Sequence, residues 1–202
     1  MQATIKGLSS EQIKTLMNER LPKKVRGFLK NLSDAGESVG MPVYLVGGFV
    51  RDLILGDQNL DLDIVVEGNG IEFAKILADK VGGRVRNHPK FYSSVVILDD
   101  GFKIDVATAR TESYRHPGAL PKVEKSSIQA DLFRRDFTIN SLAIRLNGEG
   151  SNCLIDYFDG QRDLTDKVIR VLHKLSFIDD PTRVFRAIRF EQRFQFSIEK
   201  QT

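Results

Sequence analysis

The sequence predicts an α/β or α+β fold in which helices pack against a mixed β-sheet. Two observations support this. Segments with helical and with strand periodicity alternate along the chain, and several expected strands follow one another closely, with a tight-turn signal at Asp99-Asp100-Gly101 between two of them. The 202 residues suffice for one sizeable domain, or for one domain with an appendage.

The N-terminal part of the chain is expected to be helical and to lead into the sheet. Residues 9–39 predict two helices, the first capped by Ser9 or Ser10 and the second starting at Pro22 and ended by Gly36 and Gly40. The elements expected next are a buried strand at 43–46, a turn at Gly47-Gly48, a short helix at 50–55, a strand at 60–66 and an amphipathic helix at 71–81.

The rest of the chain predicts more strands and then helices. The expected elements are strands around 84–87, 93–98 and 102–107, a loop at 111–127, a helix-like run at 132–143, a hairpin of 143–146 with 154–157, and helices from residue 163 onward. This last part is rich in arginine, which favours forked recognition of phosphate groups or bases.

Composition excludes several classes of protein. A net charge of +3 indicates a mild preference for anionic partners, and the one cysteine excludes an intrachain disulfide. No apolar stretch approaches the ~20 residues that a membrane-spanning helix needs. The N-terminus lacks the apolar core of a signal peptide, so we expect a cytoplasmic location and no membrane contact. The sequence does not indicate an oligomeric state.

Two aspartates, Asp61 and Asp63, are separated by one residue in an expected strand. Side chains two apart on a strand share a face, so these carboxylates would repel each other unless a cation bridges them. Asp105, in a second alternating segment, is the best candidate for a third carboxylate. If the two strands pair, three carboxylates converge and hold two Mg²⁺ ions, which would activate an attacking hydroxyl and stabilise a leaving pyrophosphate.

Each of these motifs also has a simpler interpretation. An Asp-x-Asp pair alone is usually a solvated strand end, and Gly47-Gly48 is usually only a turn, although its bare backbone can approach a polyanion. Arg134-Arg135-Asp136 alone indicates a salt-bridged helix start, and Arg186 with Arg189 a solvated helix face. Their occurrence together, in this order, favours a phosphate-handling site.

Five ordered segments carry a resemblance to a known family: Leu45–Leu55 with Asp61–Asp63, Lys103–Arg110, Asp131–Ala143, Asp156–Leu164 and Asp179–Phe190. They resemble the polymerase-beta-like nucleotidyltransferases, and more narrowly the class II bacterial tRNA CCA-adding enzyme and poly(A) polymerase family. The resemblance covers about residues 41–200. It implies a catalytic head with a mixed, largely antiparallel sheet at residues 1–155, including the helices at 9–39. It also implies the start of a helical neck at 156–202, with the C-terminal body and tail absent.

The resemblance implies a role for each site residue. Asp61 and Asp63 would bind the catalytic metals, and Asp105 would deprotonate or position the primer 3′-hydroxyl. The implied nucleotide-binding residues are Gly47, Gly48 and Arg51 for the triphosphate, with Asp52 bracing Arg51; Arg134, Asp136 and Asn140 for the sugar and phosphates; Asp180 and Arg183 for the base; and Arg186 for the triphosphate or for base stacking.

The implied activity is template-independent addition of C and/or A, from CTP or ATP with Mg²⁺, to the 3′ end of tRNA with release of pyrophosphate. Two alternatives stay open: poly(A) polymerase activity on general RNA, and a nucleotide-binding module without catalysis. The loop at 110–125 resembles the loops of split-activity and multidomain relatives, so the sequence leaves open which nucleotides are added. The family commonly has Glu-Asp where this chain has Asp179-Asp180, a conservative difference.

Overall fold

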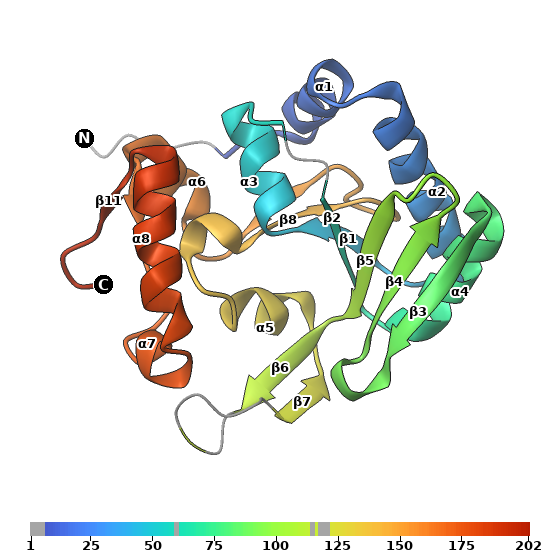
Figure 1. Ribbon diagram of the computed structural model, residues 1–202. Coiled ribbons are helices and arrows are strands. Elements are labelled where there is room, and N and C mark those ends of the chain that lie inside the picture. The colour runs from blue at the N-terminus through green and yellow to red at the C-terminus, as the bar shows by residue number, and fades with distance from the viewer. Residues whose placement is uncertain (1–6, 59–60, 114–115, 117–121) are drawn as a thin grey trace.

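The computed structural model describes residues 7–58, 61–113, 116 and 122–202. Within them, seven strands form one sheet in the order β3-β4-β5-β2-β1-β8-β9 (Figure 1). The bounds are β1 (Val43–Val46), β2 (Leu62–Val66), β3 (Gly83–His88), β4 (Ser93–Leu98), β5 (Lys103–Thr108), β8 (Leu142–Arg145) and β9 (Leu154–Asp156). Within this seven-stranded sheet only β2 and β5 pair in parallel, so the predicted mixed, largely antiparallel sheet is confirmed.

Two helices precede the sheet, as predicted. In α1 (Ser10–Arg20), the side chain of Ser9 accepts from the backbone N–H of Gln12 and the Gln12 side chain accepts in return, which satisfies two free donors of the first turn. The second helix, α2 (Lys23–Val39), follows Pro22 and ends at Gly40, whose φ of 63° suits glycine. The expectation that Gly36 ends this helix is wrong: it lies inside α2, where a Cβ would come 2.5 Å from Val43.

One face of the sheet packs in the main hydrophobic core, and the other face packs against a smaller hydrophobic cluster. The alternate residues Leu62, Ile64 and Ile104 pack in the main core with α2 and α4 (Gly70–Val81). On the other face, Val65 packs with a smaller cluster that includes Leu132 of α5 (Ile128–Phe133). Asp63 has the parity of Val65, so alternation places it on the α5 face.

Two expectations for the middle of the chain are wrong. Where a loop was expected, β6 (Arg110–Ser113) and β7 (Lys122–Lys125) form an antiparallel hairpin. Where a helix was expected at 132–143, α5 ends at Phe133, and a 3₁₀ turn, η2 (Thr138–Asn140), leads into β8. The carboxylate of Asp136 accepts from the N–H of Phe137, which offers the backbone an alternative to helical bonding.

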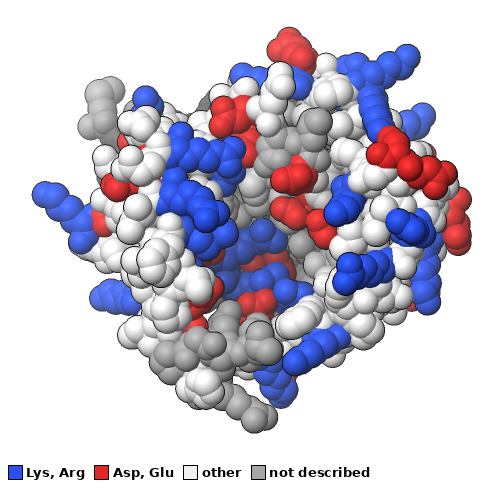
Figure 2. Space-filling view, viewed as in Figure 1, with Lys and Arg blue, Asp and Glu red and all other residues white. Residues whose placement is uncertain are grey.

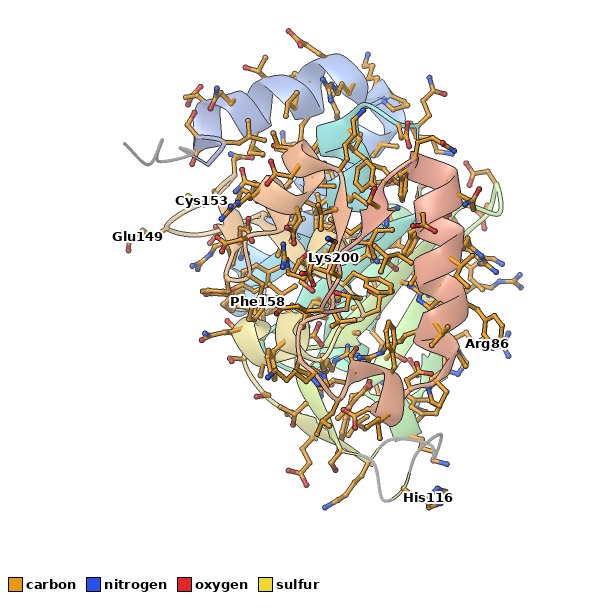
Figure 3. All side chains as sticks on the ribbon, turned by 90° about the vertical axis from the view of Figure 1, so that its left-hand side faces the viewer. Arg86, His116, Glu149, Cys153, Phe158 and Lys200 are labelled. Atoms are coloured by element: carbon orange, nitrogen blue, oxygen red, sulfur yellow. The ribbon has the colours of Figure 1, made fainter. Side chains whose placement is uncertain are left out.

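The C-terminal segment stands beside the sheet rather than in it (Figure 1). Its elements are α6 (Gly160–Asp166), β10 (Val168–Ile169), α7 (Ser176–Asp179), α8 (Thr182–Phe194) and β11 (Ser197–Ile198), with β10 and β11 paired in parallel. In the side view, Arg86 of edge strand β3 and Phe158, which follows edge strand β9, lie on opposite sides of the molecule (Figure 3). The division into a head ending at 155 and a neck from 156 stays a prediction.

The remaining described elements are α3 (Gly48–Leu55), which follows β1, and the 3₁₀ turn η1 (Pro89–Phe91), which precedes β4. No helix among the described residues is both long and apolar enough to span a bilayer.

Candidate active site

The turn after β1 brings bare backbone close to an arginine. Gly47 has a φ of 68°, and its N–H donates to the carbonyl of Leu142 at 3.0 Å. A Cβ on Gly47 would lie 2.7 Å from Nη1 of Arg135. The backbone conformation therefore requires glycine here, and a Cβ would also displace the Arg135 guanidinium. Immediately afterwards, Gly48 starts α3.

Two of the three predicted carboxylates are neighbours in the sheet. Asp63 on β2 and Asp105 on β5 are register partners on parallel strands, so their side chains leave the sheet on the same face. Asp61 lies two residues before Asp63, just outside β2. No three His, Cys, Asp or Glu side chains within the described part of the chain form a ready-made metal-binding group. The pairing of Asp63 with Asp105 is thus observed, and the place of Asp61 in a metal site stays a prediction.

The surroundings of the two carboxylates disfavour their ionised forms. Burial raises the pKa of Asp63 to about 6, with further raising from Asp105 and Asp61 and an opposing effect from Arg135. Partial burial and the charge of Asp61 also raise the pKa of Asp105, whereas Lys103 and His88 lower it. A divalent cation between the carboxylates would reverse this repulsion, and carboxylate oxygens are ligands that Mg²⁺ prefers. The residues present therefore fit a magnesium site.

Replacing Asp63 by Asn is expected to stabilise the metal-free fold at alkaline pH. The folded-state pKa of Asp63, about 6, lies above the ordinary 3.8. The protonated group therefore contributes stability that is complete below the lower value and is lost as the pH rises through the higher one. At pH 8 the ionised carboxylate costs about 3 kcal/mol. In EDTA the variant should melt about 9 °C above the wild type.

Thermal melts at pH 8 and pH 4 measure this effect, and the difference should shrink toward zero at pH 4. Asp79→Asn is the matched control because Asp79 is an exposed carboxylate on α4, across the sheet. It should leave the melting temperature nearly unchanged at both pH values. An Asp63→Asn variant that melts below the wild type at pH 8 would contradict the repulsion described above.

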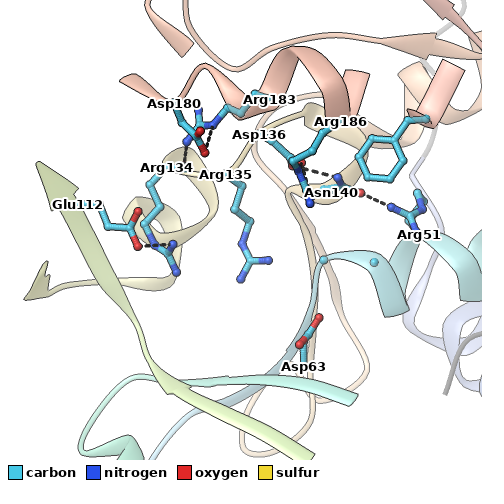
Figure 4. Close-up of a pocket in the computed structure, with 13 residues that line it drawn as sticks. Arg51, Asp63, Glu112, Arg134, Arg135, Asp136, Asn140, Asp180, Arg183 and Arg186 are labelled. Carbon is cyan, nitrogen blue, oxygen red and sulfur yellow. Dashed lines mark hydrogen bonds and ion pairs between the residues drawn. The ribbon is translucent and has the colours of Figure 1, made fainter. Parts of the chain in front are cut away.

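A cavity of about 410 Å³ lies between the sheet and α8 (Figure 4). It is lined by Gly47, Gly48, Arg51, Asp63, Glu112, Arg134, Arg135, Asp136, Asn140, Asp180, Arg183, Arg186 and Phe190. All the predicted site residues except Asp61 and Asp105 belong to this lining. Asp105 lines an adjoining cavity of about 270 Å³, which shares Asp63, Arg134 and Arg135 with the first. Asp63 therefore stands where the two cavities meet.

One side of the cavity is a continuous polar network. Arg51 Nη1 donates to Asn140 Oδ1, and Asn140 Nδ2 donates to Asp136 Oδ1 at 2.9 Å. Arg186 donates from Nε to Asp136 Oδ2 at 2.7 Å (Figure 4). The network joins α3, η2 and α8, so it fixes the distance between the glycine turn and the C-terminal helices.

Arg51 is 3% exposed and its guanidinium is fully engaged. Nε and Nη2 donate to the two carboxylate oxygens of Asp52 at 2.7 and 2.9 Å, which confirms the expected bracing. The rings of Phe190 and Phe194 lie 5.2 and 4.6 Å from its Cζ. The geometry therefore favours Arg51 as a support for the glycine turn, and its predicted contact with a triphosphate stays a prediction.

The predicted base-recognition pair is built differently from expectation. Helices were expected from residue 163 onward, and on a helix the three-residue spacing of Asp180 and Arg183 would place them on one face. Asp180 instead precedes α8 and accepts from the N–H and hydroxyl of Thr182. Arg183 is buried, and its Nη2 donates to the carbonyl of Arg134 at 2.9 Å. Its Nε lies 3.8 Å from Asp180 Oδ2, so the two side chains still act at one place.

Two charged residues of the cavity were not among the predicted site residues. Glu112 lies on β6, in the segment expected to be a loop, and accepts from Arg134 Nη1 at 2.8 Å. Arg135 points toward Asp63 from the segment after α5 (Figure 4). The sequence signal that could have identified Arg135 as a site residue is its position next to Arg134. Seen from outside, basic side chains gather along α8 and around the hollow, and acidic ones lie opposite (Figure 2).

Comparison with known proteins gives a consistent family. The protein family described as "Poly A polymerase head domain" matches residues 43–170 of this chain. The A-adding tRNA nucleotidyltransferase of Geobacter sulfurreducens is 57% identical over 187 residues, which are 93% of this chain and 21% of that protein. The A-adding tRNA nucleotidyltransferase of Halalkalibacterium halodurans is 42% identical over 96% of this chain and 45% of its own length.

Solved structures agree with the fold. The Thermotoga maritima CCA-adding enzyme complexed with tRNA is similar with a TM-score of 0.83 and 50% identity, over 93% of this chain and 42% of that one. A CCA-adding enzyme in complex with ATP gives a TM-score of 0.83 and 51% identity with the same coverage. This chain thus spans less than half the length of each of these relatives.

Proposed function

Because this chain belongs to the poly A polymerase head domain family, we propose that it transfers a nucleotide from ATP or CTP to the 3′ end of tRNA and releases pyrophosphate. The observation that carries the proposal is the pairing of Asp63 with Asp105 at the junction of two cavities. One cavity is walled by arginines and can accept a triphosphate. The other contains Asp105 and can accept the RNA end.

Each residue has a task that its position supports. Asp63 and Asp105, with Asp61, would hold two Mg²⁺ ions, which supply charge neutralisation for an in-line displacement when bound. Arg135 and the backbone of Gly47 and Gly48 face the space beside Asp63, where the phosphates would lie. Asp105 is exposed toward the second cavity and would orient the attacking 3′-hydroxyl.

Base selection would depend on Asp180 and Arg183. A carboxylate accepts from an exocyclic amino group, and a guanidinium donates to a ring acceptor. On the Watson–Crick edge, cytosine and adenine both present an amino group beside a ring acceptor, whereas uracil and guanine present a ring N–H donor there. Arg186 lies 5.4 Å from the ring of Phe190, and these two side chains offer a stacking surface beside the pair.

ATP is the substrate that we expect first. The relatives from Geobacter sulfurreducens and Halalkalibacterium halodurans, and a third from Aquifex aeolicus at 53% identity, are A-adding tRNA nucleotidyltransferases. A CC-adding relative from Deinococcus radiodurans is 39% identical. Asp180 and Arg183 could recognise either adenine or cytosine. We therefore rank ATP before CTP because the A-adding relatives share more sequence identity with this chain than the CC-adding one.

The test incubates the purified chain with Mg²⁺, each of the four α-labelled nucleoside triphosphates, and tRNA transcripts that end one, two or three nucleotides short of CCA. The expected product is one added A on the transcript that ends in CC, with GTP and UTP rejected. Long adenylate tails on general RNA would indicate a poly(A) polymerase instead. Nucleotide binding without incorporation into any transcript would contradict the proposed function.

A further inference from the structure

One residue outside the predicted site is hydrogen-bonded to two adjacent arginines of the cavity, Arg134 and Arg135. Asp131, on α5, is fully buried at 0% exposure. Its Oδ1 accepts from Arg134 Nε and Nη2 at 3.0 and 2.7 Å, and its Oδ2 accepts from Arg135 Nη2 at 2.9 Å. The backbone N–H of Arg110 also donates to Oδ1, at 3.3 Å. One carboxylate therefore holds two guanidinium groups and anchors the start of β6.

Burial opposes the ionisation of Asp131, but the two neighbouring arginines favour the ionised form more strongly. The neighbouring Arg135 and Arg134 together hold the pKa of Asp131 below its ordinary value despite its burial. A buried carboxylate is tolerated only when charged partners and hydrogen bonds compensate for its lost hydration. The three side chains accordingly form one electrostatic unit, and the removal of its negative charge would release Arg135 and weaken the hold on Arg134.

The ion pair with Asp131 determines where the Arg135 side chain lies. Its guanidinium lies beside Gly47 and points toward Asp63, yet within the described residues its one ion-pair partner is Asp131. If Arg135 were released from Asp131, it could pair with Asp63 instead, because the charge of Arg135 already acts on the Asp63 carboxylate. A direct pair between Arg135 and Asp63 would occupy the carboxylate oxygens that a metal ion needs.

We propose that Asp131 is a positioning residue of the nucleotide-transfer site: it holds Arg135 at the phosphate side of the cavity and keeps it from pairing with Asp63. This inference rests on the proposed function of the site. Arg134 is held twice, by Asp131 and by Glu112. The loss of Asp131 therefore affects Arg135 more than Arg134.

The test compares the wild-type chain with Asp131→Asn, which preserves shape but removes the charge and turns amide donors toward the arginines. The measurements are KM for ATP, kcat and the half-saturating concentration of Mg²⁺. We expect kcat/KM for ATP to fall about 100-fold, since small displacements of a positioning group have effects of this size. We also expect the Mg²⁺ requirement to rise about tenfold, because Arg135 then competes for Asp63.

Two further variants separate positioning from stability. Asp163→Asn is the matched control: Asp163 is also buried, but it binds Thr138 and Arg170 and lines neither cavity. It should lower the melting temperature without changing the Mg²⁺ requirement. In Asp131→Asn, the additional change Arg135→Gln should return the Mg²⁺ requirement toward the wild-type value, although kcat stays low.

A result in which Asp131→Asn only lowers the melting temperature, as Asp163→Asn does, would overturn the proposal. The same would follow if Arg135→Gln left the raised Mg²⁺ requirement of Asp131→Asn unchanged. If the wild-type chain binds ATP but transfers nothing, the proposed function fails. The Mg²⁺ dependence of ATP binding, measured by calorimetry on the same variants, then still decides the role of Asp131.

Discussion

Replacing Asp105 by Asn is expected to lower nucleotide transfer at least about 1,000-fold, equivalent to about 4 kcal/mol of lost transition-state stabilisation. Asp105 is the register partner of Asp63 and the exposed carboxylate of the second cavity. An amide of the same shape keeps the strand pairing but removes a metal ligand and the acceptor for the attacking hydroxyl. The effect should appear mainly in kcat, because the triphosphate is held from the other cavity.

Rates of primer extension under saturating ATP measure this prediction, with circular dichroism to verify the fold. Asp63→Asn should cause a loss of the same order, even though it is expected to stabilise the metal-free protein. Asp79→Asn, which changes an exposed carboxylate across the sheet, should retain full activity. Activity within tenfold of the wild type in Asp105→Asn would show that the paired carboxylates are not the catalytic centre.

Replacing Arg51 by Met is expected to destabilise the fold by about 3–5 kcal/mol, the range for removing one partner of a buried ion pair. Arg51 supplies two hydrogen bonds to Asp52, which is 0% exposed, and one to Asn140. Without them Asp52 keeps a longer contact, 3.5 Å, from the half-exposed Arg193. The fold should survive, because methionine fills similar volume between Phe190 and Phe194.

Urea unfolding monitored by circular dichroism gives this free energy of unfolding. Arg162→Met is the matched control, because Arg162 forms an exposed pair with Asp166 at 3.4 Å. Its loss should cost less than about 1 kcal/mol. Equal effects of the two variants would mean that the buried pair contributes no more than a solvated one.

The parts of the site that follow from alternation were predictable from sequence. Strand parity placed Asp63 on one face with Leu62 on the other, and Asp105 lies in an equally regular strand, so their pairing needed only adjacent strands. The glycine turn was predictable for a similar reason, because a helix directly after a buried strand requires a tight connection. These features depend on neighbours in the sequence.

Features that depend on which polar side chains pair with one another were not predictable. Asp131 binds Arg134 and Arg135, and no local pattern distinguishes such a buried, paired carboxylate from a solvated one. The hairpin that carries Glu112 was hidden by the glycine and prolines at 117–121, which lie outside the described residues. The position of Asp180 before α8, with its carboxylate bonded to Thr182, likewise does not follow from periodicity.

The central claim is that paired carboxylates transfer a nucleotide to an RNA end. It is tested most directly by following the α-phosphate of labelled ATP on a tRNA ending in CC, in the wild type and in Asp105→Asn. We predict one labelled nucleotide in the RNA for each pyrophosphate released, and almost none in the variant. Release of inorganic phosphate without RNA labelling, or equal labelling by the variant, would contradict the claim.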